Sequence, residues 1–168
     1  MFKILSDLVG ALTLLVLLIW LGLRITQGAD LSDESYYAVY LDDWLKEGIR
    51  ASPFLTLHQT SALLVYPAAL LFHGIAGSTG GLILFLRVLY ITGALIAALS
   101  AVALFRRAGM RLAAWLAGAL VLAFIPFGLP APSYNSLGEH ATIWTAGSSS
   151  EARARSRKSL TIVADSCT

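Results

Sequence analysis

Long runs of apolar residues, separated by polar segments, dominate the pattern along this chain. The first run covers residues 4–23 and contains a single charge, Asp7, near its start. The second covers residues 82–105 and contains one charge, Arg87, and the third covers residues 112–129 with none. An α-helix of about 20 residues crosses the roughly 30 Å hydrocarbon core of a bilayer. The pattern therefore predicts about three transmembrane helices at these positions.

The composition agrees with a membrane protein. Hydrophobic residues make up 57% of the chain and charged residues 13%, whereas soluble domains have about 25% charged residues. This excludes an ordinary soluble enzyme, a disordered chain and a nucleic-acid-binding domain, and no nucleic-acid partner is expected. The predicted fold class is all-α, an integral membrane helical bundle. Its single cysteine, Cys167, excludes an internal disulfide.

The residues after the first run favour a retained helix over a cleaved signal peptide. Arg24 follows the run directly, and the next residues, ITQGAD, contain no small-x-small cleavage pattern. We therefore expect an uncleaved anchor that is followed by a polar loop over residues 24–81.

A shorter apolar segment, residues 61–77, is ambiguous because Pro67 interrupts it. Charge placement favours one of its two possible arrangements. The link at residues 106–111 contains three arginines and no acid, so the positive-inside tendency places it in the cytoplasm together with Lys3. Both can lie there only if residues 61–77 do not cross the membrane. We therefore expect an outer juxtamembrane helix at 61–77 and a cytoplasmic amino terminus.

The acidic outer loop predicts a second amphipathic helix at about residues 32–47. Tyr36, Tyr40 and Trp44 recur every four residues, and Gly48 suits the end of the helix. Such an aromatic stripe is typical of the membrane–water interface.

Asp33 and Glu34 stand in the first turn of this helix, where two interpretations are open. Acidic residues stabilise the positive end of the helix dipole, which requires no further function. A carboxylate held at the bilayer surface can instead act as a general base.

The order of these motifs resembles that of a known enzyme family. An anchor is followed by DE-x-Y-Y at Asp33–Tyr37, an aromatic and acidic helix, a proline-containing apolar segment, Arg87 and the basic link. This order, over residues 1–138, resembles the amino-terminal part of polytopic glycosyltransferases with the GT-C fold, such as protein O-mannosyltransferases and aminoarabinose transferases of lipid A. The resemblance implies a multi-pass protein of the bacterial plasma membrane, with a polyprenyl-phosphate sugar donor and membrane lipid as partners.

The resemblance also implies roles for individual residues. Asp33 would deprotonate the acceptor hydroxyl with support from Glu34, and Tyr36 and Tyr37 would lie against substrate. Arg87 would bind the donor phosphate, although an arginine there can also extend to the lipid headgroups. No cofactor is implied, and no spacing of metal ligands is visible in the sequence.

Polar residues in two further segments are candidates for substrate contact. His58 precedes the juxtamembrane segment, where a surface histidine is the simpler interpretation. Tyr134 and Asn135 lie in the PSYNSLG stretch, which equally suits a simple turn. Asn135 can hydrogen-bond a sugar or phosphate but cannot act as a base.

The character of the sequence changes after Gly138. Residues 139–168 are rich in Ser, Ala and Arg and contain no long apolar run. We expect a disordered or frame-shifted tail there, and a chain that lacks turnover on its own. The predicted function is thus that of a membrane glycosyltransferase fragment. The alternative is a small non-enzymatic membrane subunit or transporter fragment, docking through small residues such as Gly93, Ala97 and Ala101.

Overall fold

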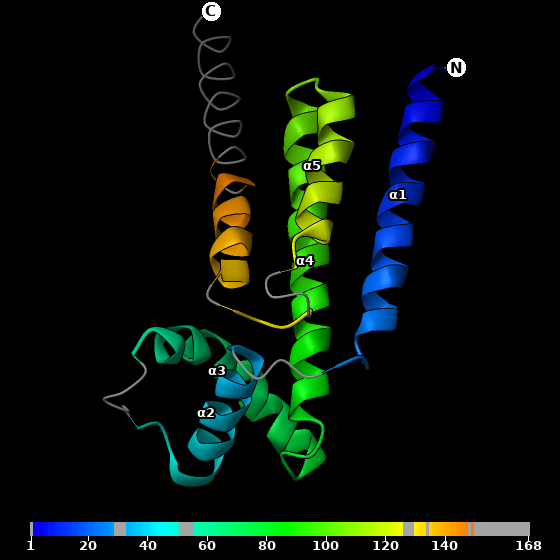
Figure 1. Ribbon diagram of the computed structural model, residues 1–168. Helices are drawn as coiled ribbons and strands as arrows, with labels where there is room; N and C mark the ends of the chain where they lie inside the picture. The colour runs from blue at the N-terminus through cyan, green and yellow to red at the C-terminus, as the bar shows by residue number, and fades with distance from the viewer. Residues whose placement is uncertain are drawn as a thin grey trace, which may run out of the picture.

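A computed structural model describes residues 2–28, 33–50, 56–125, 130–133, 135–147 and 149. Throughout this part of the chain the regular structure is helical, which confirms the all-α prediction. Five helices are labelled in Figure 1: α1 (Phe2–Arg24), α2 (Asp33–Glu47), α3 (Thr56–Ala76), α4 (Leu82–Arg107) and α5 (Arg111–Ala123). A further helix covers residues 135–147.

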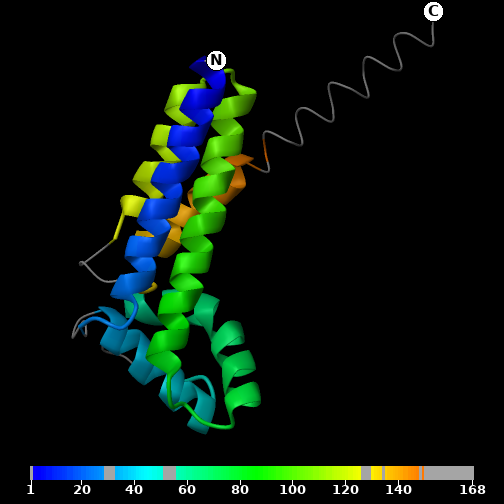
Figure 2. The same cartoon turned by 90° about the vertical axis from the view of Figure 1, so that its right-hand side faces the viewer.

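The helices form a bundle with a smaller pair of helices at one end. α1, α4 and α5 run alongside one another, whereas α2 and α3 lie at the end that is remote from the amino terminus (Figures 1 and 2). We call this the loop end, and we call the other end, which holds the α4–α5 link, the link end. α1 and α4 are long and apolar enough to cross a membrane by length and composition.

Small residues let α4 and α5 approach each other closely. On α4, Ala94, Ala97 and Ala101 are buried, and on α5 Ala114 and Gly118 are buried. A Cβ atom added at Gly118 would lie 2.6 Å from the Val102 side chain, which is too close for a real contact. The small-residue face predicted from the sequence is therefore a contact within the chain.

The third predicted span is shorter in the structure than in the sequence pattern. α5 has 13 residues, about 20 Å of helix, whereas the apolar run covers residues 112–129. The helix ends at Ala123, and Phe124, its C-cap, is extended, two residues before Pro126. Proline has no N–H to continue a helix and disfavours helical geometry in the residue before it, Ile125, so a stop shortly before Pro126 is expected. The Tyr90 hydroxyl donates a hydrogen bond to the Phe124 carbonyl and ties this end of α5 to α4.

α3 packs against α2 at the loop end, beside the start of α4 (Figure 2). It begins at Thr56, before the predicted segment at 61–77, and Pro67 lies inside the helix. The helix therefore lies at the loop end, and the expectation that it lies along the outer surface of the membrane stays a prediction.

The aromatic stripe of α2 faces α3. Tyr40 and Trp44 are buried, and the Trp44 ring lies 5.9 Å from the Tyr66 ring of α3 in an edge-on arrangement. The sequence predicted that this stripe faces the membrane interface and did not predict its contact with α3. The pattern of one helix does not show which neighbouring helix covers its apolar face.

The helix at residues 135–147 crosses the boundary expected at Gly138. Ser133 caps its start: the Ser136 N–H donates to Ser133 Oγ at 3.2 Å, and the Ser133 N–H donates to Ser136 Oγ at 2.8 Å. His140 is buried, 5.7 Å from the Tyr90 ring. Residues 139–147 are thus helical, while residues 150–168 lie outside the part that the structure describes.

Candidate functional site

The most tightly bonded polar group of the loop end joins the start of α2 to α4. Glu34 is the second residue of α2 and Arg87 the sixth of α4, and both side chains are buried. Arg87 Nε donates to Glu34 Oε1 at 2.6 Å, and Arg87 Nη2 donates to Glu34 Oε2 at 2.7 Å. This two-pronged geometry is the strongest form of an arginine–carboxylate pair.

The same guanidinium also holds the backbone that follows α1. Arg87 Nη1 donates to the carbonyl oxygens of Ile25 at 2.7 Å and Gln27 at 3.2 Å, and Nη2 donates to that of Gly28 at 3.0 Å. A guanidinium has five N–H donors. These five bonds use all of them, so a phosphate could bind Arg87 only by displacing one of these partners.

Burial explains why both charges of the Glu34–Arg87 pair are needed. Moving a charged side chain out of water costs roughly several kcal/mol of hydration free energy. An opposite charge and hydrogen bonds must offset that cost. The Arg87 side chain is 4% exposed and that of Glu34 is 1% exposed, so each requires the other. Arg87 therefore connects α4 to both α2 and the segment at residues 25–28.

Asp33 lies directly beside the Glu34–Arg87 pair. It is the first residue of α2, immediately before Glu34, and its side chain lies outside the described part of the structure. Since both Glu34 carboxylate oxygens accept bonds from Arg87, Glu34 is poorly placed to accept a proton from a substrate. Of the two predicted catalytic carboxylates, Asp33 is therefore the one that we consider as the base.

Arg24 is a cation at the loop end that the sequence interpretation did not single out. It ends α1, and its guanidinium carbon lies 5.2 Å from the centre of the Trp20 ring. Its Nε is buried and has no hydrogen-bond partner among the described residues. Arg24 therefore retains a donor, unlike Arg87. Its position directly after an apolar run was visible in the sequence and was interpreted only as the end of the anchor.

The other predicted substrate-binding residues do not form one cluster. Tyr37 is fully buried in the packing of α2, whereas Tyr36 is 40% exposed. Asn135 is exposed in the last helix. Tyr134 and the side chain of His58 lie outside the described residues, and the His58 backbone is part of α3. Among the described residues, no group of three His, Cys, Asp or Glu side chains could hold a metal ion.

Comparisons with protein-family models, with curated proteins and with solved structures found no match for this chain. The functional argument therefore depends on the geometry of the site itself.

Proposed function

We propose that residues 1–138 are the amino-terminal, membrane-embedded part of a glycosyltransferase. It would transfer a sugar from a polyprenyl-phosphate donor to an acceptor at the outer face of a bacterial plasma membrane. The loop end would face outward and the link end, with its arginines, would face the cytoplasm. The observation that carries this proposal is the buried Glu34–Arg87 pair, which fixes the start of α2 and hence the backbone of Asp33.

In this proposal Asp33 removes the proton from the acceptor hydroxyl. The acceptor oxygen forms a bond to the anomeric carbon of the sugar. The bond between that carbon and the phosphate oxygen breaks, and the lipid phosphate leaves with the electron pair. A general base must be held within hydrogen-bond reach of the proton it takes, and a rigid neighbour supplies this. Glu34 and Arg87 are therefore positioning residues.

The departing phosphate requires a cation with free donors. Arg87 was the residue implied by the family resemblance, but its five donors are engaged. We assign this role to Arg24, which lies at the loop end and keeps a donor without a partner among the described residues.

The alternative functions receive less support from the same structure. A docking subunit would use the small-residue faces of its helices, and the α4–α5 contact already buries them. A transporter requires polar groups near the middle of the membrane. The hydroxyls of Thr92 and Ser100 donate to carbonyls of their own helix, those of Val88 and Ile96. His140, beside Tyr90 of α4, is buried in the packing between helices. We therefore prefer the enzyme proposal.

Donor binding tests the proposal without requiring turnover. Membranes that contain the chain are irradiated with a polyprenyl phosphate carrying a photoreactive group in its isoprenoid tail. We expect labelling that unlabelled polyprenyl phosphate displaces, and about tenfold weaker labelling of Arg24→Gln, as for the loss of one hydrogen bond to a charged group. Arg107→Gln, at the link end, is the matched control and should be labelled like the wild type. Labelling that resists competition, or that is equal in the two variants, would contradict the proposal.

A further inference from the structure

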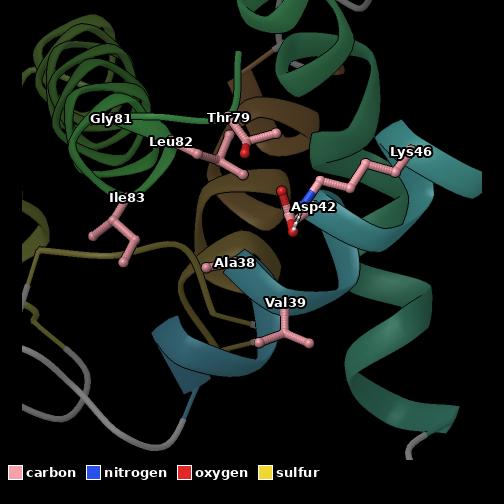
Figure 3. A pocket seen from close by; sticks show the side chains of 8 residues that line it. All are labelled: Ala38, Val39, Asp42, Lys46, Thr79, Gly81, Leu82 and Ile83. Atoms are coloured by element: carbon pink, nitrogen blue, oxygen red, sulfur yellow. Dashed lines mark hydrogen bonds and ion pairs between the residues drawn. The ribbon is translucent and has the colours of Figure 1, made fainter.

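A groove lies between α2 and the turn that precedes α4 (Figure 3). Its volume is about 370 Å³, which lies within the range of small-ligand sites. Asp42, the central polar residue of the groove, is two helical turns beyond Glu34 along α2, so the groove is separate from the Glu34–Arg87 pair. We call it the Asp42 groove. It is lined by Ala38, Val39, Asp42, Lys46, Thr79, Gly81, Leu82 and Ile83.

The polar part of the groove is a dipole with no net charge. Lys46 Nζ lies 2.6 Å from Asp42 Oδ2, and the two side chains point toward each other in Figure 3. The hydrogen bond from Lys46, together with one from Thr79, lowers the pKa of Asp42. The hydrogen bond to Asp42 raises the pKa of Lys46. Both groups are therefore charged at neutral pH, and their side chains are 31% and 60% exposed, so both remain accessible to a ligand.

Apolar side chains stand next to this dipole. Val39 is 58% exposed on one side of the groove and Ile83 is 42% exposed on the other. Farther along α4, Leu84 and Val88 are also exposed, at 47% each. A ligand that matches both parts has a dipolar head beside Asp42 and Lys46 and an apolar body along α4.

We propose that the Asp42 groove binds a phospholipid with a phosphoethanolamine headgroup. The ligand ammonium would donate hydrogen bonds to the Asp42 carboxylate, and the ligand phosphate would accept one from the Lys46 ammonium. A ligand with only a negative charge would be attracted by Lys46 but repelled by Asp42, and one with only a positive charge would meet the reverse, so a ligand that carries both charges matches the pair best. A primary ammonium is favoured over the quaternary ammonium of choline, because choline has no N–H to donate to Asp42. The inference rests on the membrane placement in the proposed function.

Lipid retention on the purified chain tests this inference. The detergent-solubilised chain is mixed with POPE, POPC or POPG and examined by native mass spectrometry. We expect the wild type to retain POPE about tenfold more strongly than POPC, corresponding to hydrogen bonds from the ammonium to a charged acceptor. Asp42→Asn should lower POPE binding to the level of POPC. Asp43→Asn, the neighbouring exposed acid outside the groove lining, is the matched control and should keep the preference.

Each outcome decides the question. Equal retention of POPE and POPC by the wild type, preferential retention of POPG, or loss of the preference in Asp43→Asn as well as in Asp42→Asn would overturn the inference. Displacement by free phosphoethanolamine as readily as by POPE would show that the apolar wall contributes nothing, and would overturn the lipid assignment. Photolabelling by polyprenyl phosphate is independent of these results, so failure here leaves the proposed function to its own test.

Discussion

At the residue scale, the pairing of Glu34 with Arg87 is the feature from which the functional account starts. The two side chains are 53 residues apart in sequence and are both buried. Removing one member would leave the other as a buried charge without its main partner. Replacing both by apolar residues would avoid that penalty.

Glu34→Met and Arg87→Met, alone and together, test this interdependence. We expect each single variant to lose about 3–5 kcal/mol of unfolding free energy, and the double variant to lose much less than the sum. Denaturant titration in detergent micelles, followed by circular dichroism, measures these values. As a control, Lys46→Gln, which breaks the exposed ion pair with Asp42, should leave the unfolding free energy nearly unchanged. Additive losses in the double variant would show that the two residues act separately.

The sequence indicated the importance of these residues but not their relation. An arginine in an apolar run is a functional candidate, and that reasoning selected Arg87, which the structure shows to be buried and paired. It did not show that the partner of Arg87 is Glu34 together with three backbone carbonyls, because such partners depend on tertiary contacts between distant segments. The family resemblance implies that Arg87 binds the donor phosphate, whereas we propose that Arg24 does so.

At the element scale, apolar periodicity predicted the helices better than their ends or contacts. α1 and α4 occupy the two runs predicted for residues 4–23 and 82–105; α1 begins two residues earlier and ends one residue later than its run, and α4 ends two residues later. α5 stops early because Phe124 is extended shortly before Pro126. The helix at 135–147 was missed since its start depends on the Ser133–Ser136 cap rather than on an apolar stripe.

The close approach of α4 and α5 makes Gly118→Ala a test of helix packing. The new Cβ would lie 2.6 Å from Val102 Cγ2 and 3.3 Å from the Ala98 carbonyl oxygen, so the helices must move apart. We expect a loss of about 1–3 kcal/mol in the same denaturant titration. Gly22→Ala on α1 is the matched control, because no atom lies within 4 Å of its added Cβ. That variant should be neutral or up to about 1 kcal/mol more stable. Equal effects at both glycines would show that the close contact is not important.

At the scale of the whole molecule, the two ends of the bundle differ in the charged residues that they contain. The link end contains Arg106 and Arg111, which pair with Asp7 of α1 at 3.1 and 3.4 Å. The loop end contains α2, α3, Arg24 and the Glu34–Arg87 pair (Figure 1). Because basic residues favour the cytoplasmic side, our proposal puts the loop end on the outer side of the membrane. The sequence predicted that the acidic loop and the basic link lie at opposite ends of the helices, because an apolar run separates the two segments.

Accessibility to a membrane-impermeant maleimide tests this placement most directly. Cys167→Ser removes the native thiol, and Ser78→Cys and Ala108→Cys then introduce exposed thiols on either side of α4. In intact cells we predict that position 78 is labelled and that position 108 is labelled only after the membrane is permeabilised. Labelling of position 108 from outside while position 78 is protected, or labelling of both from the same side, would contradict the account.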